Sequence, residues 1–302
     1  MDFRELSYIV SIAKQQNITR ASEEVYVSQP TLSKFVQNLE NYLGQPLFRR
    51  LGNKFLLTYA GELYVEKAKA MLAMKKELDQ ELSDIIRQNI GELKIAFPIM
   101  RGNYMLPCTL PVFRKEFPRV KVSIHEANSS VMEDMILGGE IDIAFFTLPI
   151  KHPDISYDII NLEEILLIMS PDHPLASAGI PREGCKYPWI DIGLLRDEEF
   201  IIQRSDQRTR QIFDKIFHNA GFDPRIAMEI RNIQASVQLA SGGFGMTFVG
   251  ETHLRHIRTD VNPACFSVGT PRTTTSFVAA YRRGIYLPNY AQRFVNIVRE
   301  FT

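Results

Sequence analysis

The sequence predicts a small all-α domain with a β-hairpin, then one long helix, and then a two-lobed α/β domain. Three helical patterns and two short strand patterns occupy residues 3–58. Residues 58–88 contain no proline and a single glycine, Gly61. From residue 91 onward, short apolar runs alternate with helical stretches, which is typical of α/β domains. A chain of 302 residues is also long for a single core.

The composition is that of a folded globular protein. Hydrophobic residues make up 45% and charged residues 23% of the chain, which argues against disorder. The N-terminus has no basic stretch followed by an apolar run, and no segment reaches the roughly 18 uncharged apolar residues that a membrane span needs. The three cysteines form no CxxC motif and fit reduced thiols in a cytosol. We therefore expect a cytoplasmic protein with no membrane partner.

Local signals predict three helices in the first 45 residues. Apolar residues recur at helical spacing over residues 3–15. Thr19 is the expected N-cap of a second helix at residues 20–25, and Ser28 is the expected N-cap of a third. Pro30 is tolerated in the first turn of that third helix, and Gly44 stands where a C-terminal glycine belongs.

The third helix is predicted to expose a polar face. Its apolar stripe leaves the following residues on other faces: Gln29, Pro30, Ser33, Lys34 and Gln37. Hydrogen-bonding side chains of this kind suit base edges in the major groove, where Gln pairs with adenine and Lys with guanine. Taken alone, the same face could be an ordinary solvated helix surface.

A basic hairpin is predicted directly after the third helix. Residues 48–58 have basic flanks, a Gly52-Asn53 turn and an apolar strand. The formal net charge of the chain is zero, but residues 1–58 hold seven Lys and Arg against five acidic residues. Short helices, a polar third helix and a basic hairpin together predict a winged helix-turn-helix, a DNA-binding module.

Short motifs in this region also resemble a known signature in order and spacing. They are Thr19-Arg20-Ala21-Ser22-Glu23, Val27-Ser28-Gln29-Pro30-Thr31-Leu32-Ser33-Lys34, Leu39-Glu40, Leu43-Gly44, Pro46-Leu47-Phe48-Arg49-Arg50 and Leu57-Thr58-Tyr59-Ala60-Gly61. The signature is that of bacterial LysR-type transcription regulators. The resemblance implies a sequence-specific DNA-binding regulator, not an enzyme, whose activity is controlled by a small-molecule effector bound between two lobes and which needs no cofactor.

The resemblance also implies particular DNA contacts. The DNA-binding residues that it suggests are Ser28, Gln29, Pro30, Thr31, Ser33, Lys34, Gln37, Arg50 and Lys54. Lys34 stands where the family usually has arginine. Because lysine is a point charge and arginine a bidentate fork, the base preference at this position does not follow from the resemblance.

The long helix carries a heptad seam. Seven residues follow a 4,3,4,3,4,3 spacing: Tyr64, Ala68, Met71, Lys75, Leu78, Leu82 and Ile85. Such a seam predicts pairing with a second chain, and Lys75 within it can specify register. The alternative is a long helix packed on its own domain. We expect a homodimer or homotetramer on a double-stranded, roughly palindromic operator, with RNA polymerase as a further partner at target promoters.

The rest of the chain predicts two similar α/β lobes. Strands are expected at residues 93–97, 120–124 and 141–146 and helices at 110–117 and 131–137, followed by a second set of strands and helices between 165 and 249. A weaker family resemblance continues here, in Gly91-Glu92-Leu93, Leu106-Pro107, Gly139-Glu140-Ile141-Asp142-Ile143-Ala144, His173-Pro174-Leu175-Ala176 and Gly242-Gly243-Phe244-Gly245.

The family's domain resembles periplasmic binding proteins, whose lobes are joined by crossing strands and close on a ligand. We expect a DNA-binding domain at 1–58, a linker helix at 59–89 and an effector-binding domain at 90–302. By this likeness the first lobe holds about 91–161 and 268–302, and the second about 162–267. Ligand closure would then re-space the DNA-binding domains.

Ligands of open α/β sheets collect beyond the carboxyl ends of the strands, near helix N-termini. Matching the family position by position, the effector-binding residues are Pro98, Met100, Arg101, Ser129, Thr147, Gln203 and Arg204. Pro98 and Met100 stand where relatives often have hydroxyls, so we expect a larger ligand with an apolar part. An anion drawn by Arg101 or Arg204 is one interpretation, and ordinary surface charges are the other.

Other function classes find little support in the sequence. GxSxG, P-loop and HExxH motifs are absent, and His253 and His256 at helical spacing have no Cys or third nearby His to complete a metal site. Residues 200–210, where the family's peroxide-sensing branch keeps cysteine, contain none. A solute-binding protein that kept only its sensing half and an architectural DNA-binding protein without an effector remain as alternatives.

Overall fold

The computed structural model describes residues 2–52, 54–85 and 90–302, and the side chains of 83–85 are not described. The chain folds as two compact units, residues 1–88 with 138–140 and residues 89–137 with 141–302. Among the described residues, no helix combines the length and the hydropathy that crossing a membrane requires.

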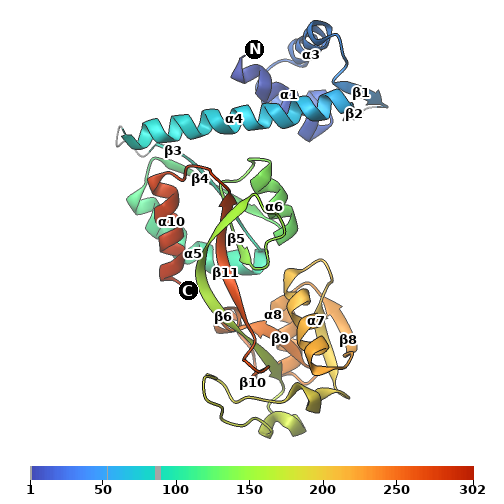
Figure 1. Cartoon of the computed structure of the whole chain (residues 1–302), viewed down its shortest axis with the longest axis vertical. Coiled ribbons are helices and arrows are strands. Elements are labelled where there is room, and N and C mark those ends of the chain that lie inside the picture. Colours follow the sequence, from blue (N-terminus) through green and yellow to red (C-terminus); the bar gives the residue numbers. More distant parts are fainter. Residues whose placement is uncertain (1, 53, 86–89) are drawn as a thin grey trace. The chain divides into compact units, whose positions relative to one another are not determined.

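The N-terminal unit is a helix-turn-helix with a wing and a long helix (Figure 1). Its elements are α1 (Phe3–Gln15), α2 (Ile18–Glu24), α3 (Gln29–Leu43), β1 (Phe48–Leu51), β2 (Lys54–Leu57) and α4 (Tyr59–Ile85). The predicted helices, hairpin and long helix are all present. β1 and β2 pair antiparallel, with Arg50 opposite Phe55. Asn53 of the predicted turn and residues 86–89 of the predicted linker lie outside the described residues.

The helix caps confirm two of the three predictions. Ser28 accepts a hydrogen bond from the backbone N–H of Thr31 at 3.3 Å, and Gly44 ends α3 with φ +67°. The prediction for α2 was wrong, because Asn17 rather than Thr19 is the N-cap. The Asn17 side chain accepts from two backbone N–H groups, those of Thr19 and Arg20, so α2 begins at Ile18.

Two of the seven predicted seam residues of α4 pack against its own unit. Ala68 is 2% exposed, and Tyr64 contacts the core that Ile9 and Val36 help to form. The remainder stays open, with Met71, Leu78 and Leu82 exposed. The first part of the long helix therefore packs on its own domain, and pairing of the remainder with a second chain stays a prediction. The side chain of Ile85, the last seam residue, lies outside the described set.

The C-terminal unit is α/β throughout (Figure 1). Its helices and strands are β3 (Gly91–Phe97), α5 (Ile99–Glu116), β4 (Val120–Glu126), α6 (Ser129–Leu137), β5 (Ile143–Thr147), β6 (Ile155–Met169), β7 (Glu199–Gln203), α7 (Arg208–Ala220), β8 (Arg225–Ile230), α8 (Ile233–Ser241), β9 (Thr247–Gly250), α9 (Glu251–His256), β10 (Ala264–Ser267), β11 (Thr274–Arg282) and α10 (Asn289–Glu300). Two short 3₁₀ helices, Pro174–Ser177 and Ile192–Leu195, precede β7.

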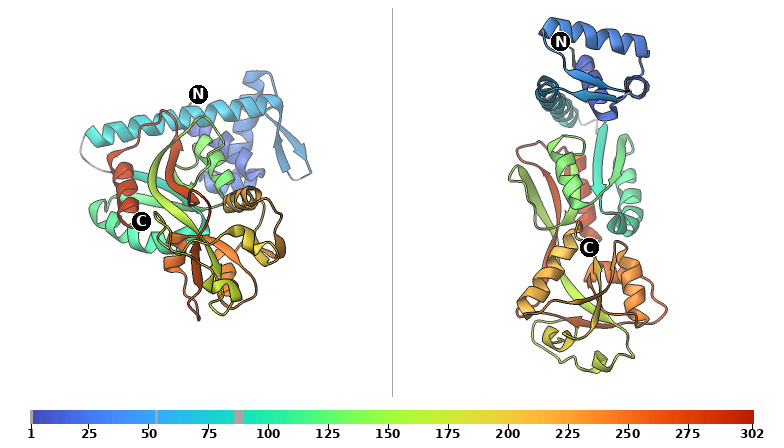
Figure 2. Two further views of the ribbon diagram at one scale, coloured as in Figure 1. Left: turned by 60° about the horizontal axis from the view of Figure 1, so that its bottom comes forward. Right: turned by 90° about the vertical axis from the view of Figure 1, so that its right-hand side faces the viewer.

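Two lobes share one long strand, as the two views in Figure 2 also show. In lobe 1, β3 lies between β4 and β5 in parallel, and β11 runs antiparallel to β5. β6 pairs with β11 up to Glu164, and from Ile165 onward it pairs with β9 and β10 of lobe 2. The parallel pair β7 and β8 completes lobe 2. The predicted two-lobed α/β architecture is confirmed.

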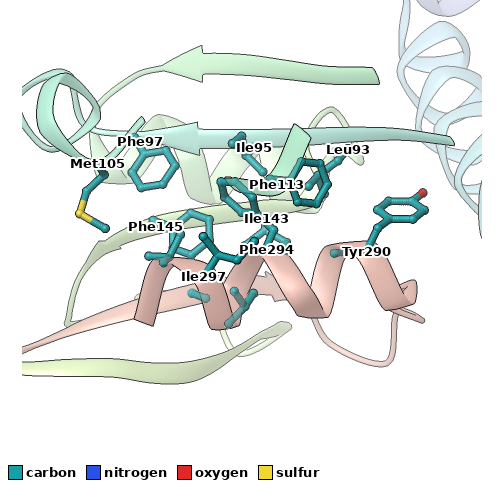
Figure 3. Packing of buried hydrophobic residues seen from close by; sticks show 14 of the residues in the cluster. Leu93, Ile95, Phe97, Met105, Phe113, Ile143, Phe145, Tyr290, Phe294 and Ile297 are labelled. Carbon is teal, nitrogen blue, oxygen red and sulfur yellow. The ribbon is translucent and has the colours of Figure 1, made fainter. Parts of the chain in front are cut away.

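Aromatic packing forms the core of lobe 1 (Figure 3). Phe97 of β3 stacks on Phe145 of β5 with ring centroids 4.6 Å apart, and Phe294 of α10 meets Phe145 edge-on. Phe113 of α5 joins the same cluster. This core fixes the carboxyl ends of β3 and β5, from which the candidate ligand-binding residues follow.

Helix α5 is longer than predicted. It starts at Ile99 instead of residue 110 and contains Pro107 and Pro111. Prolines inside a helix each remove a hydrogen bond, so local propensity argues for a later start. Burial outweighs this cost, because Arg101, Met105, Thr109 and Phe113 recur every four residues on the buried face.

Candidate nucleic-acid interface and ligand cleft

Helix α3 presents a polar face that its own domain does not use. Leu32 and Val36 hold the opposite face in the core, with exposed fractions of 0% and 5%. Gln29, Pro30, Thr31, Lys34 and Gln37 are exposed, and Ser33 is half-buried. The Oγ atom of Ser28 lies 2.7 Å from the Oγ1 atom of Thr31, so the capping hydroxyl is already engaged. The predicted DNA-contacting residues of α3 therefore share one accessible surface.

The wing carries the second group of predicted DNA contacts. The guanidinium carbon of Arg50 lies 4.9 Å from the ring centroid of Phe55, the residue opposite it across the hairpin. A cation–π contact of this kind orients the side chain without neutralising it. Lys54 is exposed at the start of β2. The backbone N–H of Phe55 also donates to the carbonyl of Gln16 at 2.9 Å, which ties the hairpin to the end of α1.

The predicted effector-binding residues occupy the carboxyl ends of strands in both lobes. Pro98 follows β3, Thr147 ends β5 and Ser129 begins the helix after β4. On lobe 2, Gln203 ends β7 and the exposed Arg204 follows it.

Two of these residues have distinctive surroundings. The partly buried side chain of Met100, on α5 of lobe 1, packs against a lobe 2 cluster that includes Leu166 and Val237. Gln203 is fully buried and donates to Ser236 at 3.4 Å, while its Oε1 atom has no hydrogen-bond partner. Met100 thus makes a hydrophobic contact between the lobes, and Gln203 holds an unsatisfied acceptor at the carboxyl end of β7.

Arg101 departs from the expectation that it attracts a ligand anion. Its side chain is buried, and its two terminal nitrogens donate to the two carboxylate oxygens of Glu163 at 2.6 and 2.8 Å. The guanidinium also lies 3.9 Å from the ring centroid of Phe277 on β11. Because Glu163 already neutralises this charge, Arg101 does not offer a free guanidinium to a ligand. Of the two candidate arginines, Arg204 alone stays in the proposal.

A cluster of aromatic and imidazole rings surrounds this ion pair and joins α5 to α9. The Nε2 atom of His253 lies 3.4 Å from Arg101, and its Nδ1 atom lies 3.5 Å from the hydroxyl of Tyr104. Tyr104 also stacks on His256, with ring centroids 4.1 Å apart. His253 is thus a buried partner in a contact between the lobes.

Burial and charge strongly shift the protonation equilibria of this cluster. Burial opposes ionisation of Glu163, but Arg101 outweighs it and lowers the Glu163 pKa to about 2. Burial, with the nearby charge of Arg101, lowers the pKa of His253 to about 3. Burial raises the pKa of Tyr104 to about 12. At neutral pH the cluster therefore holds one ion pair beside a neutral imidazole and a neutral phenol.

A second buried ion pair, between Arg208 and Glu133, was missed from the sequence. Arg208 begins α7 of lobe 2, Glu133 lies on α6 of lobe 1, and their side chains are 4% and 6% exposed. Arg208 also donates to the carbonyl of Thr147 at 3.3 Å and lies over the ring of Phe146. One signal was available: Glu133 interrupts an apolar helical pattern next to the buried Met132, and a carboxylate there needs a partner.

Comparison with protein families agrees with both halves of this geometry. Residues 3–62 match the model of the bacterial regulatory helix-turn-helix protein, lysR family, and residues 87–302 match the LysR substrate binding domain. An exposed polar helix with a basic wing, followed by a two-lobed ligand-binding fold, defines a ligand-responsive DNA-binding regulator. The chain belongs to the LysR family of transcription regulators.

Individual relatives extend over nearly the whole chain. AlsR of Bacillus subtilis, an HTH-type transcriptional regulator, is 28% identical over 299 residues, covering 98% of this chain and 95% of its own length. Full-length CbnR, solved in complex with its target DNA, has a TM-score of 0.62 at 26% identity and covers all of both chains. A full-length OxyR from Pseudomonas aeruginosa shares the fold, with a TM-score of 0.77 at 23% identity over 100% of this chain and 94% of that one.

The buried neutral state of His253 predicts a pH-dependent stability. Because the folded-state pKa lies below the ordinary value of 6.5, the unfolded chain binds more protons below that pH, and stability falls as pH decreases from 6.5 toward 3. The loss between pH 6.5 and 5 is about 2 kcal/mol. Urea unfolding at pH 7 and pH 5 should show this loss in the wild type and a clearly smaller one in His253→Gln.

Two features separate the effect of His253 from that of other groups, and the neighbouring His256, whose pKa burial also lowers, accounts for part of the loss that remains in His253→Gln. The Glu163 effect falls below its ordinary pKa of 4.5 and so lies outside this pH range. A control substitution at exposed His218 should keep the wild-type pH dependence. An unchanged pH dependence in His253→Gln would mean that another group is responsible.

Proposed function

We propose that this regulator recognises its operator with the exposed face of α3 and holds the DNA backbone with its wing. The observation that carries the proposal is the polar, solvent-facing surface of α3, whose uncharged amides suit base edges while its apolar side is locked in the core. The proposed contacts are Ser28, Gln29, Pro30, Thr31, Ser33, Lys34 and Gln37 on or beside the helix, and Arg50 and Lys54 on the wing. Wing cations contribute phosphate attraction, which is independent of sequence.

We infer that α4 pairs two chains. Its uncovered apolar side chains include Leu63, Met74, Leu78 and Leu82, each about half exposed or more. An apolar groove of about 380 Å³ lies beside Leu63 and Met71, between α4 and the residues Leu6 and Leu43 of the same unit. Pairing would bury this surface and present two copies of α3 to a roughly palindromic site. The proposal covers a homodimer or a homotetramer.

The effector is proposed to bind where the strand ends of the two lobes meet. The residues that we keep for this site are Pro98, Met100, Ser129, Thr147, Gln203 and Arg204. Ligand binding would change the orientation of one lobe relative to the other, and this change would alter the spacing of the DNA-binding domains. Such coupling requires different effector affinities in the two arrangements.

Further parts of the proposal rest on the family's role. Because the family regulates transcription, we propose that the protein contacts RNA polymerase at target promoters and acts in the cytoplasm. The proposed division of the chain stays at 1–58 for DNA binding, 59–89 for the linker helix and 90–302 for effector binding.

Selection of preferred sites from a random duplex pool by the purified chain tests sequence-specific binding, and a pool without enrichment after repeated rounds would contradict it.

Separate substitutions distinguish base recognition from phosphate attraction. Gln29→Ala should weaken binding to the selected site by about 1–3 kcal/mol and leave binding to random DNA unchanged, because an amide–base contact carries sequence information. Arg50→Ala should weaken both. Fluorescence anisotropy with specific and random duplexes at fixed salt measures these effects, and equal losses on both duplexes for Gln29→Ala would remove Gln29 from base recognition.

Chain pairing through α4 is testable by a charge placed on its exposed stripe. Leu78→Glu should prevent burial of this face, and sedimentation at micromolar concentration should then give the mass of a single chain. Glu81→Gln, at a neighbouring exposed position of α4, is the matched control and should keep the wild-type mass. A Leu78→Glu variant that keeps the oligomeric mass of the wild type would place the interface elsewhere.

A further inference from the structure

A groove between the lobes is lined by residues that follow Arg208 on α7 and Thr147 on β5. The groove has a volume of about 960 Å³. Leu148 and Pro149 of lobe 1 and Ile212 and Ile216 of α7 give it apolar walls, and Leu162 of β6 also lines it. The polar part of the lining includes hydroxyls of the loop and strand at residues 270–276 and the charged side chains of Asp191, Lys215 and Arg272.

Chain connectivity places Arg208 beside this groove. Gln211 and Ile212, which line it, follow Arg208 by three and four residues on α7, so the three side chains share one helix face. On the opposite lobe, the carbonyl of Thr147 accepts a hydrogen bond from Arg208, and the next residue, Leu148, lines the groove. The arginine is therefore paired with a buried carboxylate and lies one helical turn before the groove-lining residues of α7.

We propose that Arg208 is the anion-binding residue of the effector site, that the Glu133 carboxylate competes with the effector for it, and that the effector is a carboxylate whose apolar body lies in this groove. This inference rests on the proposed function, since it names the ligand class and the switch of the same domain. In place of Arg101 it assigns an anion contact to a residue that the sequence did not single out, and Arg204 stays in the proposed site.

The chemistry of Arg208 favours this ligand class. A planar guanidinium is geometrically matched to a carboxylate. In this structure the carboxylate paired with Arg208 is that of Glu133. Burial makes the pairing selective, because an uncharged group would leave the guanidinium without a counter-charge in a water-poor site. The apolar walls of the groove accept an aliphatic or aromatic body.

Glu133 is arranged so that it can give up Arg208. Its Oε2 atom accepts from the backbone N–H groups of Lys151 and His152 at 3.0 and 3.2 Å, both in lobe 1. When a ligand carboxylate takes Arg208, Glu133 keeps these two donors within its own lobe. The direct link between α6 and α7 is then replaced by a link through the ligand, which changes how the lobes are held together.

Ligand binding by full-length variants tests this competition. The probes are hexanoate and benzoate, each compared with its uncharged amide, in thermal-shift titrations. Glu133→Gln removes the competing charge and should bind the carboxylates with an apparent dissociation constant at least about tenfold lower than the wild type. Glu133→Gln/Arg208→Gln removes both charges without stranding either, and its unfolding temperature should not respond. The amides should not stabilise any variant.

The matched control is Arg231→Gln, an exposed arginine of the same lobe that pairs with Asp206. It should respond to the carboxylates as the wild type does. Equal carboxylate responses with and without Arg208 would overturn the proposal, and so would a Glu133→Gln variant that responds to neither carboxylate. Site selection from the random duplex pool is independent of this result, so failure here leaves the DNA-binding proposal standing.

Discussion

The contact between Arg101 and Glu163 determines how the two lobes are joined. Glu163 lies on β6 at the point where that strand leaves β11 of lobe 1 and begins to pair with β9 and β10 of lobe 2. Its partner comes from α5 of lobe 1, while Thr252 and His253 of α9 approach from lobe 2. A buried carboxylate without its arginine is strongly unfavourable, so the pair holds α5 against the shared strand.

Gly250 shows how closely lobe 2 packs on this carboxylate. A Cβ atom at Gly250 would lie 3.2 Å from an oxygen of Glu163. Close packing of this kind, together with the neutral His253, leaves the cluster little freedom to rearrange. We therefore regard it as the fixed part of the lobe interface.

The pair of Arg208 and Glu133 is of a different kind. It connects α7 to α6, and neither of its residues lies on the shared strand β6. The Glu133 carboxylate also accepts hydrogen bonds from two backbone N–H groups within lobe 1. Breaking this contact removes a link between lobes but no strand pairing. One buried ion pair thus joins α5 to the shared strand, and the other is the one that we propose to exchange with a ligand. A ligand-responsive regulator requires both properties in the same domain.

Local signals were sufficient for most of the N-terminal unit. Ser28 and Gly44 mark the ends of α3, and the Gly52 turn with basic flanks marks the wing. Where two capping residues lay close together, Asn17 and Thr19, the choice depended on backbone geometry that the sequence does not specify. The helix predicted at 110–117 was shorter than α5. Pro107 and Pro111 oppose a helix locally, whereas tertiary burial of one face favours it.

The lobe interface was predictable only in part. Strand ends indicated where ligand-binding residues gather, but the partners of Arg101 and Arg208 lie 62 and 75 residues away in the chain. Pairings at that separation depend on how the lobes fold against each other. The usable signal was indirect: Glu133 and Glu163 are acidic residues within apolar patterns, and each needs a buried cation.

The central claim is that the lobe interface controls the DNA-binding unit of the same chain. The most direct measurement is the affinity and nuclease footprint of the full-length protein on its selected DNA site, compared between the wild type, Glu133→Gln and the Arg231→Gln control. The account predicts that Glu133→Gln changes the affinity about fivefold or more, or alters the footprint, while the control does neither. Identical affinities and footprints for all three proteins would contradict coupling through this interface.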